Sequence, residues 1–309
     1  VKAQPKVPQV IYVQNSVHLA GAQKSLSRIL EHATIRNTTP ILVTSQSGWL
    51  TSFASELGIR VVTLPFPKSR SLKARMYQNR LFAKRLARDL REHVDPRRSA
   101  VVHANDHPDS LIAWNLADAL GVPSVLTLRS SQMKARDFFK YGCGRHDTVI
   151  SVGDELYQKA CSWMPTAKNV RVYNGVSDDE FYEPSRSTGE VVDKVLILGS
   201  MNPLKGWGDV VEALIRIEQE SLCSARPKIT FLGAQNGLDP EVTLGTDRLQ
   251  QFETEFLPPV VNYSDHLRQF PLVIHPSRSE SFGMAALETV AAGVPLLAAS
   301  SGVIPSFID

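Results

Sequence analysis

The sequence is poor in cysteine and contains no long apolar run. Its three cysteines, Cys143, Cys161 and Cys223, lie far apart among 309 residues, at spacings unlike those of metal ligands. We therefore expect free thiols and a reducing compartment such as the cytoplasm. No apolar run reaches the roughly 18 residues of a membrane-spanning helix, and residues 1–9 lack the hydrophobic segment of a signal peptide. These absences predict a soluble protein.

The net charge of +3 conceals an uneven distribution of basic residues. Segment 68–93 holds nine Lys and Arg residues against Asp89 and Glu92, a local charge of +7 that leaves −4 for the rest of the chain. At about 100° per residue, its apolar residues form one stripe and its basic residues an adjacent face, which predicts an amphipathic helix. The stripe contains Leu72, Met76, Phe82, Ala83, Leu86 and Leu90, and the basic face contains Lys73, Arg80, Lys84, Arg88 and Arg91.

Such a basic helix has two interpretations that the sequence leaves open. One is an ordinary surface helix that packs through its apolar stripe. The other is a face that docks on an anionic membrane or attracts a polyanionic acceptor, so that the protein would be peripheral to a membrane. We expect no nucleic acid as a partner, because the segment lacks the interleaved aromatic and glycine residues that stack on bases.

Short β-branched runs alternate with longer helical patterns along the chain. This alternation predicts an α/β fold in which parallel sheets carry helices on both faces. The strands expected in a first sheet are 10–13, 41–44, 60–63, 101–103, 124–127, 148–152 and 170–173. Those expected in a second sheet are 194–198, 228–232, 272–275 and 295–298. The polar segment 183–194 is the predicted linker between a domain at 1–182 and a domain at 195–309.

The segment 275–300, HPSRSESFGMAALETVAAGVPLLAAS, carries two glutamates, Glu280 and Glu288. Glu280 precedes a Ser-Phe-Gly turn, and the Ala-rich run from Met284 predicts a helix that ends at Gly293. Free amides at the start of this helix would favour a phosphate beside Glu280. The helical spacing keeps the two carboxylates within about 12 Å of each other. One could therefore hold a sugar and the other a ribose, with a diphosphate between them.

This arrangement resembles the signature of the retaining, nucleotide-sugar-dependent glycosyltransferases of family 4. The Pro-Ser, the Glu-Ser-Phe-Gly, the second glutamate and the Ala-Gly-Val-Pro follow one another in the order of that family. Weaker similarity covers most of the chain and includes VIYVQNSVHLAGAQKSLSRIL, VVHANDHPD, VRVYNGVSDDEFYEP and LILGSMNPLKGWGDVVEAL. The resemblance implies the GT-B fold, in which two Rossmann-like domains face each other across a cleft. Family members continue with further helices, so we expect the second domain to be truncated at its C-terminus.

The resemblance also implies a reaction and a set of site residues. The protein would move a sugar from a nucleotide diphosphate sugar to a hydroxyl of a glycan, lipid-linked sugar or small molecule, with retention. Glu280 would contact the donor sugar and Glu288 the ribose hydroxyls. The diphosphate would lie against Lys205 and the turn formed by Ser281, Phe282 and Gly283. No residue is an evident nucleophile, and the family suggests that the leaving phosphate itself deprotonates the acceptor.

One position departs from the pattern of the family. Family members place an arginine directly after the first glycine of the segment GSMNPLKGW, and here that position is Ser200. One of two cations expected on the diphosphate is therefore missing, which lowers the expected rate unless another cation replaces it. Arg129 and Arg278 are candidates on the basis of spacing.

Two further site candidates lie in the first half of the chain. Gly21 follows a predicted strand and begins a helix, where a glycine lets a phosphate or an acceptor approach the backbone, although it could be a plain turn residue. His107 lies at the carboxyl end of a strand, the side on which open α/β sheets bind ligands. The resemblance implies that His107 faces the donor sugar, and His103 is interpreted as a strand residue. Local hydrogen bonding is the alternative for both histidines.

The sequence contains no Asp-x-Asp, the carboxylate pair that holds a divalent ion in the other large glycosyltransferase fold. We expect no metal and no cofactor, because Lys205 and helix amides can neutralise the phosphates. Two other functions stay open. One is a GT-B-fold sugar-nucleotide epimerase, which needs no acceptor, and the other is a non-catalytic protein that binds nucleotide sugars.

Overall fold

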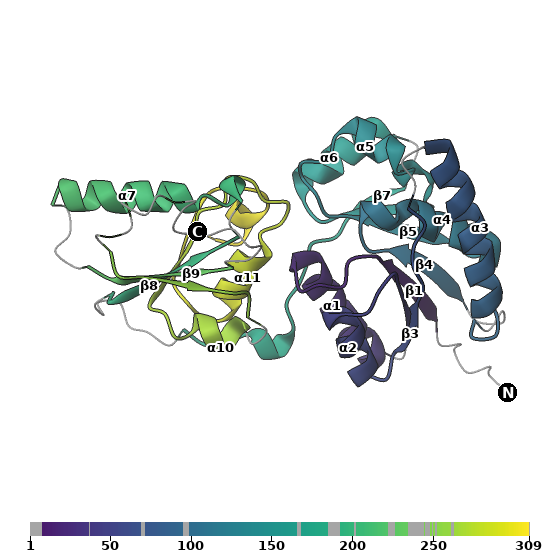
Figure 1. Ribbon diagram of the computed structural model, residues 1–309, viewed down its shortest axis with the longest axis horizontal. Coiled ribbons are helices and arrows are strands. Elements are labelled where there is room, and N and C mark those ends of the chain that lie inside the picture. Colours follow the sequence, from purple (N-terminus) through teal and green to yellow (C-terminus); the bar gives the residue numbers. More distant parts are fainter. Residues whose placement is uncertain are drawn as a thin grey trace. The chain divides into compact units, whose positions relative to one another are not determined.

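A computed structural model describes residues 8–36, 38–68, 72–94, 99–165, 168–184, 192–200, 202–221, 226–233, 244, 248, 250, 252–260 and 263–308, with the backbone alone for 72–75. The chain divides into two compact units, Val1–Asn174 and Gly175–Asp309, called unit 1 and unit 2 below (Figure 1). Each unit is built on a parallel sheet of its own, so the predicted α/β class is confirmed.

Unit 1 contains a seven-stranded parallel sheet with the order β3-β2-β1-β4-β5-β6-β7. The strands are β1 (Gln9–Gln14), β2 (Thr39–Thr44), β3 (Arg60–Thr63), β4 (Ala100–Ala104), β5 (Ser124–Leu128), β6 (Thr148–Ser151) and β7 (Asn169–Arg171). The strand order reverses between β1 and β4, which makes this pair the switch point of a doubly wound sheet. All seven strands lie where the β-branched runs predicted them.

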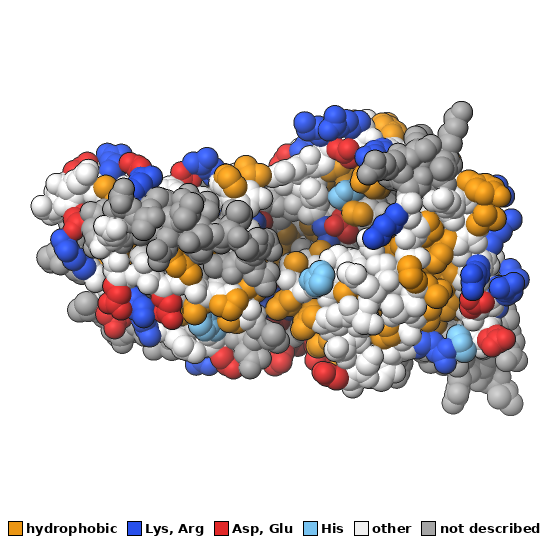
Figure 2. Space-filling model, viewed as in Figure 1, with side chains coloured by type: hydrophobic (Ala, Val, Ile, Leu, Met, Phe, Trp, Pro, Cys, Tyr) orange, Lys and Arg blue, Asp and Glu red, His pale blue; other side chains and the backbone are white. Residues whose placement is uncertain are grey.

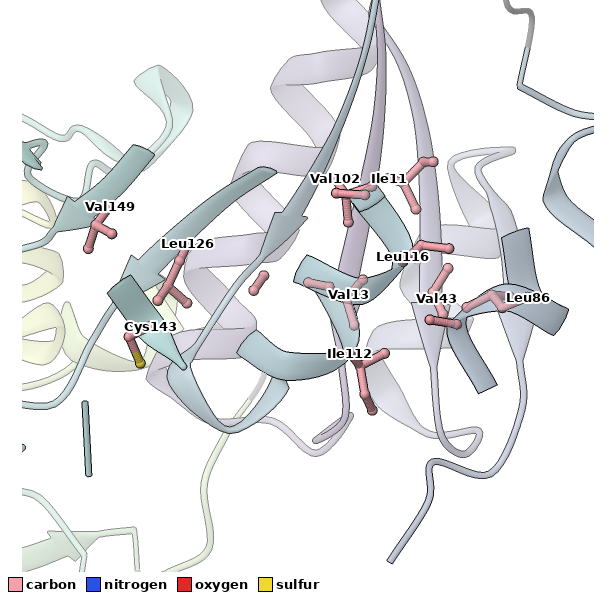
Figure 3. Packing of buried hydrophobic residues seen from close by; sticks show 14 of the residues in the cluster. Ile11, Val13, Val43, Leu86, Val102, Ile112, Leu116, Leu126, Cys143 and Val149 are labelled. Atoms are coloured by element: carbon pink, nitrogen blue, oxygen red, sulfur yellow. The ribbon is translucent and has the colours of Figure 1, made fainter. Parts of the chain in front are cut away.

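Helices cover both faces of this sheet. They are α1 (Gly21–Ile35), α2 (Trp49–Glu56), α3 (Leu72–Leu90), α4 (Ser110–Leu120), α5 (Ala135–Lys140) and α6 (Asp154–Trp163), with 3-10 turns η1 (His107–Asp109) and η2 (Cys143–Arg145). Ile11 and Val13 pack on one face with residues of α3 and α4 (Figure 3), whereas Tyr12 packs on the other face with α1 and α2. Because both faces are covered, most residues of the central strands are buried, which explains their predominantly apolar runs.

Unit 2 contains a five-stranded parallel sheet with the order β10-β9-β8-β11-β12. Its strands are β8 (Lys194–Leu198), β9 (Lys228–Leu232), β10 (Thr254–Leu257), β11 (Leu272–His275) and β12 (Leu296–Ala298). Its helices and turns are η3 (Asp178–Glu180), η4 (Pro203–Lys205), α7 (Trp207–Gln219), α10 (Tyr263–Leu267), α11 (Met284–Ala291) and η5 (Ile304–Ser306). β10 was not predicted, because this edge strand is only half-buried and lacks an apolar run. The sheet reverses between β8 and β11.

The boundary between the units falls earlier than the predicted domain end at residue 182. Tyr182 donates its backbone N–H to the carbonyl of Ala291 at 2.8 Å, and the Arg268 guanidinium lies 4.1 Å from the centre of the Tyr182 ring. Gly293 permits this contact, since a Cβ there would lie 2.8 Å from the Tyr182 oxygen. The residues directly after Asn174 therefore pack on unit 2. Most of the predicted linker 183–194 lies outside the described residues.

Helix α3 confirms the predicted amphipathic helix, with one correction. Ala83, Leu86 and Leu90 of the expected apolar stripe are fully or almost fully buried, but Met76 is 38% exposed. Tyr77 and Leu81 are exposed as well, although Asn79 between them is buried, so the apolar side chains described in the first half of α3 are left largely uncovered. The side chain of Leu72, also placed in the stripe, lies outside the described residues. Neither α3 nor any other helix in the described ranges is long and apolar enough to cross a membrane.

Candidate functional site

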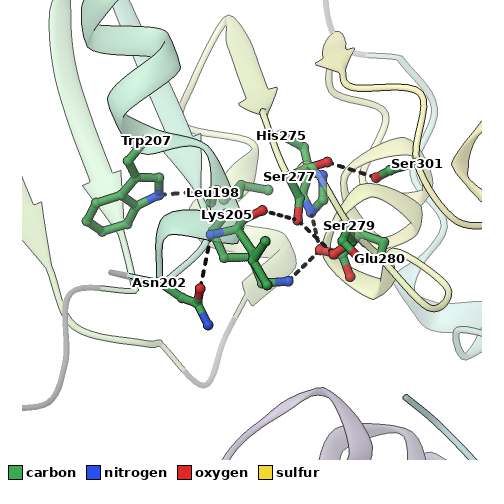
Figure 4. Close-up of polar contacts among 10 residues, drawn as sticks. Leu198, Asn202, Lys205, Trp207, His275, Ser277, Ser279, Glu280 and Ser301 are labelled. Atoms are coloured by element: carbon green, nitrogen blue, oxygen red, sulfur yellow. Dashed lines mark hydrogen bonds and ion pairs between the residues drawn. The ribbon is translucent and has the colours of Figure 1, made fainter. Parts of the chain in front are cut away.

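Unit 2 brings Lys205 and Glu280 together at the carboxyl edge of its sheet. Lys205 is the last residue of η4, in the loop after β8, and Glu280 lies in the loop between β11 and α11. These loops meet because β8 and β11 are neighbours in the sheet. The Lys205 Nζ lies 2.5 Å from the Glu280 Oε1 (Figure 4). Two predicted site residues thus form one ion pair.

The two loops hold each other through their backbones. Arg278 donates its N–H to the carbonyl of Leu204 at 2.8 Å. Gly206, with φ +72°, approaches Pro276 so closely that a Cβ would lie 2.1 Å from the Pro276 carbonyl oxygen. Only glycine fits this combination of a positive φ and a close approach. Lys205 is therefore carried by a loop that is fixed against the segment before Glu280.

A buried histidine lies behind the carboxylate. His275, the last residue of β11, is 2% exposed, and its Nε2 lies 3.5 Å from the Glu280 Oε1. Burial lowers the pKa of His275 below its usual value, so the imidazole is neutral at neutral pH. The Glu280 Oε1 therefore faces both Lys205 and His275. Sequence reasoning missed His275, although a polar residue at the end of a buried strand was a usable signal.

Glu288, the second glutamate of the motif, lies inside α11 and is 4% exposed. It is close to Tyr263, whose pKa is raised well above its usual value first by burial and second by the Glu288 charge. A buried carboxylate of this kind forms strong hydrogen bonds because little water competes for it. Glu288 is the fifth residue of α11 and lies more than one turn inside the helix, as predicted, whereas Glu280 lies in the preceding loop.

The turn between Glu280 and α11 has the predicted form. Ser281 and the buried Phe282 lead to Gly283, which has φ +94° and precedes the first helical residue, Met284. A Cβ at Gly283 would lie 2.5 Å from the Ile304 side chain, so this position needs glycine both for its backbone and for its packing. The first turn of α11 contains no acidic residue, and its amides carry the partial positive charge of a helix start.

The position of the missing arginine carries no cation. Ser200 accepts a hydrogen bond from the Asn202 N–H at 2.7 Å through its carbonyl, which turns the chain towards η4. Arg278, one suggested replacement, is 61% exposed and donates from Nε to the Asp209 Oδ2 at 2.7 Å. Its charge is therefore already matched by a carboxylate. Arg129, the other suggested replacement, belongs to unit 1.

An open hollow of about 220 Å³ adjoins the loop after β8. The Arg278–Asp209 pair lies at its lining. The other lining residues are Asn202, Pro203, Gly206, Trp207, Gly208 and Leu244. Neither Lys205 nor Glu280 lines this hollow, so the ion pair and the hollow are neighbours rather than one site. Within the described residues, no group of three or more His, Cys, Asp or Glu side chains is arranged to hold a metal ion.

The predicted residues of unit 1 lie at the carboxyl edge of its sheet. Gly21 is the first residue of α1, and a Cβ there would meet no atom within 4 Å, so packing does not require glycine at this position. His107 begins η1 and packs edge-on against Tyr141 at 5.1 Å between ring centres. His103 is a strand residue, as predicted, and desolvation lowers its pKa to about 3.

Two family matches together cover most of the chain. Residues 19–180 match Glycosyltransferase Family 4, and residues 140–307 match Family 4 Glycosyltransferase in conflict systems. The chain belongs to glycosyltransferase family 4. The resemblance that rested on the glutamate motif is therefore confirmed at the level of the family.

Curated relatives of this family 4 chain include proteins from archaea and bacteria. An uncharacterized glycosyltransferase of Methanocaldococcus jannaschii is 25% identical over 207 residues, which cover 63% of this chain and 54% of the relative. The D-inositol 3-phosphate glycosyltransferase of Mycobacterium leprae is 33% identical over 232 residues, which cover 66% and 54%. The chain spans about half the length of these relatives.

Solved structures share the fold. The Anabaena protein HepE in complex with UDP-glucose has a TM-score of 0.75 and 15% identity, over 97% of this chain and 83% of that one. A glycosyltransferase of Rickettsia africae has a TM-score of 0.75 and 16% identity, over 98% and 82%. At these identities the likeness shows the fold, which is the predicted GT-B type with two parallel α/β sheets.

Proposed function

We propose that this family 4 protein is a retaining glycosyltransferase that moves a sugar from a nucleoside diphosphate sugar to a hydroxyl acceptor without a metal ion. The Lys205–Glu280 pair carries the proposal. It lies on two interlocked loops at the strand reversal of unit 2, the place where doubly wound sheets bind ligands. HepE, a protein of the same fold, was solved with UDP-glucose, which supports a nucleotide sugar as the donor.

Lys205 is proposed to stabilise the negative charge that develops on the leaving diphosphate. Without a donor its ammonium pairs with Glu280. A bound diphosphate would compete for that ammonium and leave Glu280 to accept hydrogen bonds from sugar hydroxyls. The Ser200 loop and the amides of the turn 281–283 at the start of α11 would complete the diphosphate site, since anions bind well at helix starts.

Three residues are proposed to complete the donor and acceptor sites. Glu288 would accept hydrogen bonds from the ribose hydroxyls, and its burial would strengthen them. In unit 1, His107 would face the donor sugar and Gly21 would let a phosphate or the acceptor approach the backbone. The Mycobacterium leprae relative is named for D-inositol 3-phosphate, which supports a small hydroxyl compound as one class of acceptor.

We propose the cytoplasm as the compartment, with peripheral contact to an anionic membrane through α3. Cys143 and Cys161 are free thiols, which suits a reducing environment. On α3, Tyr77 is 65% and Leu81 50% exposed, beside exposed basic residues of the same helix. Figure 2 shows hydrophobic and basic side chains gathered at the right-hand edge, where α3 lies. Exposed apolar and cationic side chains together are typical of helices that lie in a membrane interface.

The decisive experiment incubates the protein with a panel of nucleotide sugars, with and without hydroxyl acceptors and with a metal chelator. We expect release of nucleoside diphosphate that depends on an acceptor and continues in chelator, and NMR of the product should show the anomeric configuration of the donor. Conversion of the donor sugar without an acceptor would identify an epimerase instead. Tight binding without any conversion would identify a binding protein.

A further inference from the structure

A polar network surrounds one cation at the switch point of unit 1. Asn105, which follows β4 and is fully buried, donates from Nδ2 to the Gln14 Oε1 at 2.6 Å and to the Ala22 carbonyl in the first turn of α1 at 3.2 Å. Arg129, which follows β5, donates from Nε to the Asn105 carbonyl at 2.9 Å and from Nη2 to the Asn105 Oδ1 at 2.8 Å. The guanidinium is therefore fixed between two strand ends and the start of α1.

Arg129 is also bound by Ser25 and Asn174. Its Nη1 donates to the Ser25 Oγ at 3.1 Å and to the Asn174 Oδ1 at 2.9 Å. The Asn174 oxygen must point to the guanidinium, which only donates, so its Nδ2 points elsewhere. This Nδ2 makes no hydrogen bond within the described residues. One N–H of the Arg129 Nη2 is also unused, because five donors meet four acceptors. The network thus offers several free donors and a positive charge.

No carboxylate in the described part of the chain lies within ion-pair distance of Arg129, and the charge of Asp106 acts on it only from farther away. All four of its acceptors are neutral, and Asp106, which acts on it from beyond ion-pair distance, binds His107 at 3.0 Å. Burial lowers the pKa of Arg129 to about 10, so it stays charged at neutral pH. Burial also holds the pKa of His146 at about 4, which keeps that imidazole neutral. A partly buried charge without a counter-ion is costly, and a bound anion would offset that cost.

We infer that Arg129 and the Nδ2 of Asn174 bind a phosphate group of the acceptor in unit 1. Phosphate fits because it only accepts hydrogen bonds and the free groups of the network only donate them. The start of α1, whose first turn has no acidic residue and whose N-cap Ala20 has no side-chain cap, adds a favourable field beside the network. The inference deepens the proposed function by naming the acceptor class, a phosphorylated hydroxyl compound such as a sugar phosphate.

The test observes Arg129 itself. In the full chain labelled with ¹⁵N-arginine, the Nε–H resonance of Arg129 is identified by its absence in Arg129→Lys, and the protein is titrated with glucose 6-phosphate, inorganic phosphate or glucose. We expect glucose 6-phosphate to shift this resonance, glucose to leave it unchanged, and inorganic phosphate to bind at least tenfold more weakly than glucose 6-phosphate. Equal binding of inorganic phosphate would overturn the acceptor assignment, and no shift with either phosphate would overturn the site.

Variants separate this site from the donor site. Asn174→Ala should weaken glucose 6-phosphate at least tenfold, whereas Arg136→Met, which removes an exposed arginine of α5 beside Asp137, should not. Lys205→Ala removes the proposed donor contact of unit 2 and should leave the titration of Arg129 unchanged. A response of Arg129 in a protein without transferase activity would uphold the phosphate site and reject the proposed function. Equal affinities in Asn174→Ala and the intact protein would reject the site.

Discussion

Lys205 and Glu280 neutralise each other in the absence of a donor, so the loss of the lysine affects both the leaving group and the carboxylate. We expect Lys205→Ala to lower the turnover number about a hundredfold or more, because the charge that develops on the diphosphate loses its cation. Steady-state kinetics at saturating donor measure this effect. Arg278→Ala is the matched control: its guanidinium is bound to Asp209, so turnover should not change. Normal turnover in Lys205→Ala would place the cation elsewhere.

The proposed roles of Glu288 and Glu280 can be distinguished by measuring how each variant binds the nucleoside diphosphate and the intact sugar donor. Glu288→Gln should weaken the nucleoside diphosphate by about 1.5–3 kcal/mol for each charge-assisted hydrogen bond to the ribose that is lost. Glu280→Gln should weaken only the sugar-bearing donor, because Glu280 is proposed to touch the sugar. Calorimetry with the nucleoside diphosphate and with the intact donor makes the comparison. Unchanged nucleotide affinity in a folded Glu288→Gln protein would remove this residue from the site.

At the residue scale, the sequence singled out Lys205 and Glu280 as candidates but did not predict that they pair. Lys205 and Glu280 are 75 positions apart and meet only because β8 and β11 are neighbours in the sheet, which strand patterns do not reveal. His275 was missed because a histidine beside three apolar strand residues resembles a core position. The partners of Arg129 come from three other segments of unit 1, so its network could not be inferred from spacing.

At the scale of elements, whether a strand or helix face could be predicted from the sequence depended on how completely it is buried. The central strands are predominantly apolar because helices cover both of their faces, and the sequence predicted them. The half-buried edge strand β10 has no such run and was missed. In α3 the apolar stripe was predicted over the whole helix, but Met76 is exposed whereas Ala83, Leu86 and Leu90 are buried. Amphipathic spacing identifies a helix face without stating how much of it is covered.

The exposed basic side chains of α3 give the membrane proposal a direct test. We expect the protein to float with vesicles of anionic lipid and to be released by salt, because each Lys or Arg near such a surface contributes about 1 kcal/mol that is screened over about 8 Å at physiological ionic strength. Reversal of three exposed α3 cations to glutamate, at Lys84, Arg85 and Arg88, should abolish flotation. Reversal of three exposed cations at α5, at Lys134, Arg136 and Lys140, should not. Equal flotation of both variants would reject the role of α3.

At the scale of the whole molecule, the buried side chains of His146 and Asp109 should change the free energy of unfolding with pH in opposite directions. Burial lowers the pKa of His146 from 6.5 to about 4 and raises that of Asp109 from 3.8 to about 7. Between pH 4.5 and 6 the unfolded chain therefore binds a proton at His146 that the folded chain does not, and stability rises with pH. At Asp109 the folded chain binds the extra proton, and stability falls with pH. Each slope is about 1.4 kcal/mol per pH unit.

Two variants that cannot titrate isolate these opposing slopes. Urea unfolding measures the free energy of unfolding at several pH values between 4.5 and 6. The slope of this free energy against pH should be about 1.4 kcal/mol per pH unit lower in His146→Gln than in the unmodified protein, and higher by the same amount in Asp109→Asn. Both replacements can keep the existing hydrogen bonds, to Ser110 and from the Asn15 N–H respectively. If both variants have the same slope as the unmodified protein, the pKa values of His146 and Asp109 do not differ between the folded and unfolded chains.

The two sheets were predicted from the sequence, but the point where they divide was not. Residues 175–184 contain no strand and form only the short turn η3, so no apolar pattern marked their attachment to unit 2. The segment is attached to unit 2 by a hydrogen bond from the Tyr182 N–H to the carbonyl of Ala291, which is distant in the sequence. Contacts of this kind depend on the three-dimensional arrangement, which a local pattern does not contain.

Each sheet is built from one uninterrupted stretch of the chain, and this has a consequence for biosynthesis. All seven strands of unit 1 precede residue 175, so none of its hydrogen-bond partners has to wait for unit 2. Domains of this kind fold as units in the order in which the ribosome releases them. Unit 1 can therefore bury its core while the residues of unit 2 are still being added. A nascent chain stalled after the whole of unit 1 has left the ribosomal tunnel should already contain a complete N-terminal sheet.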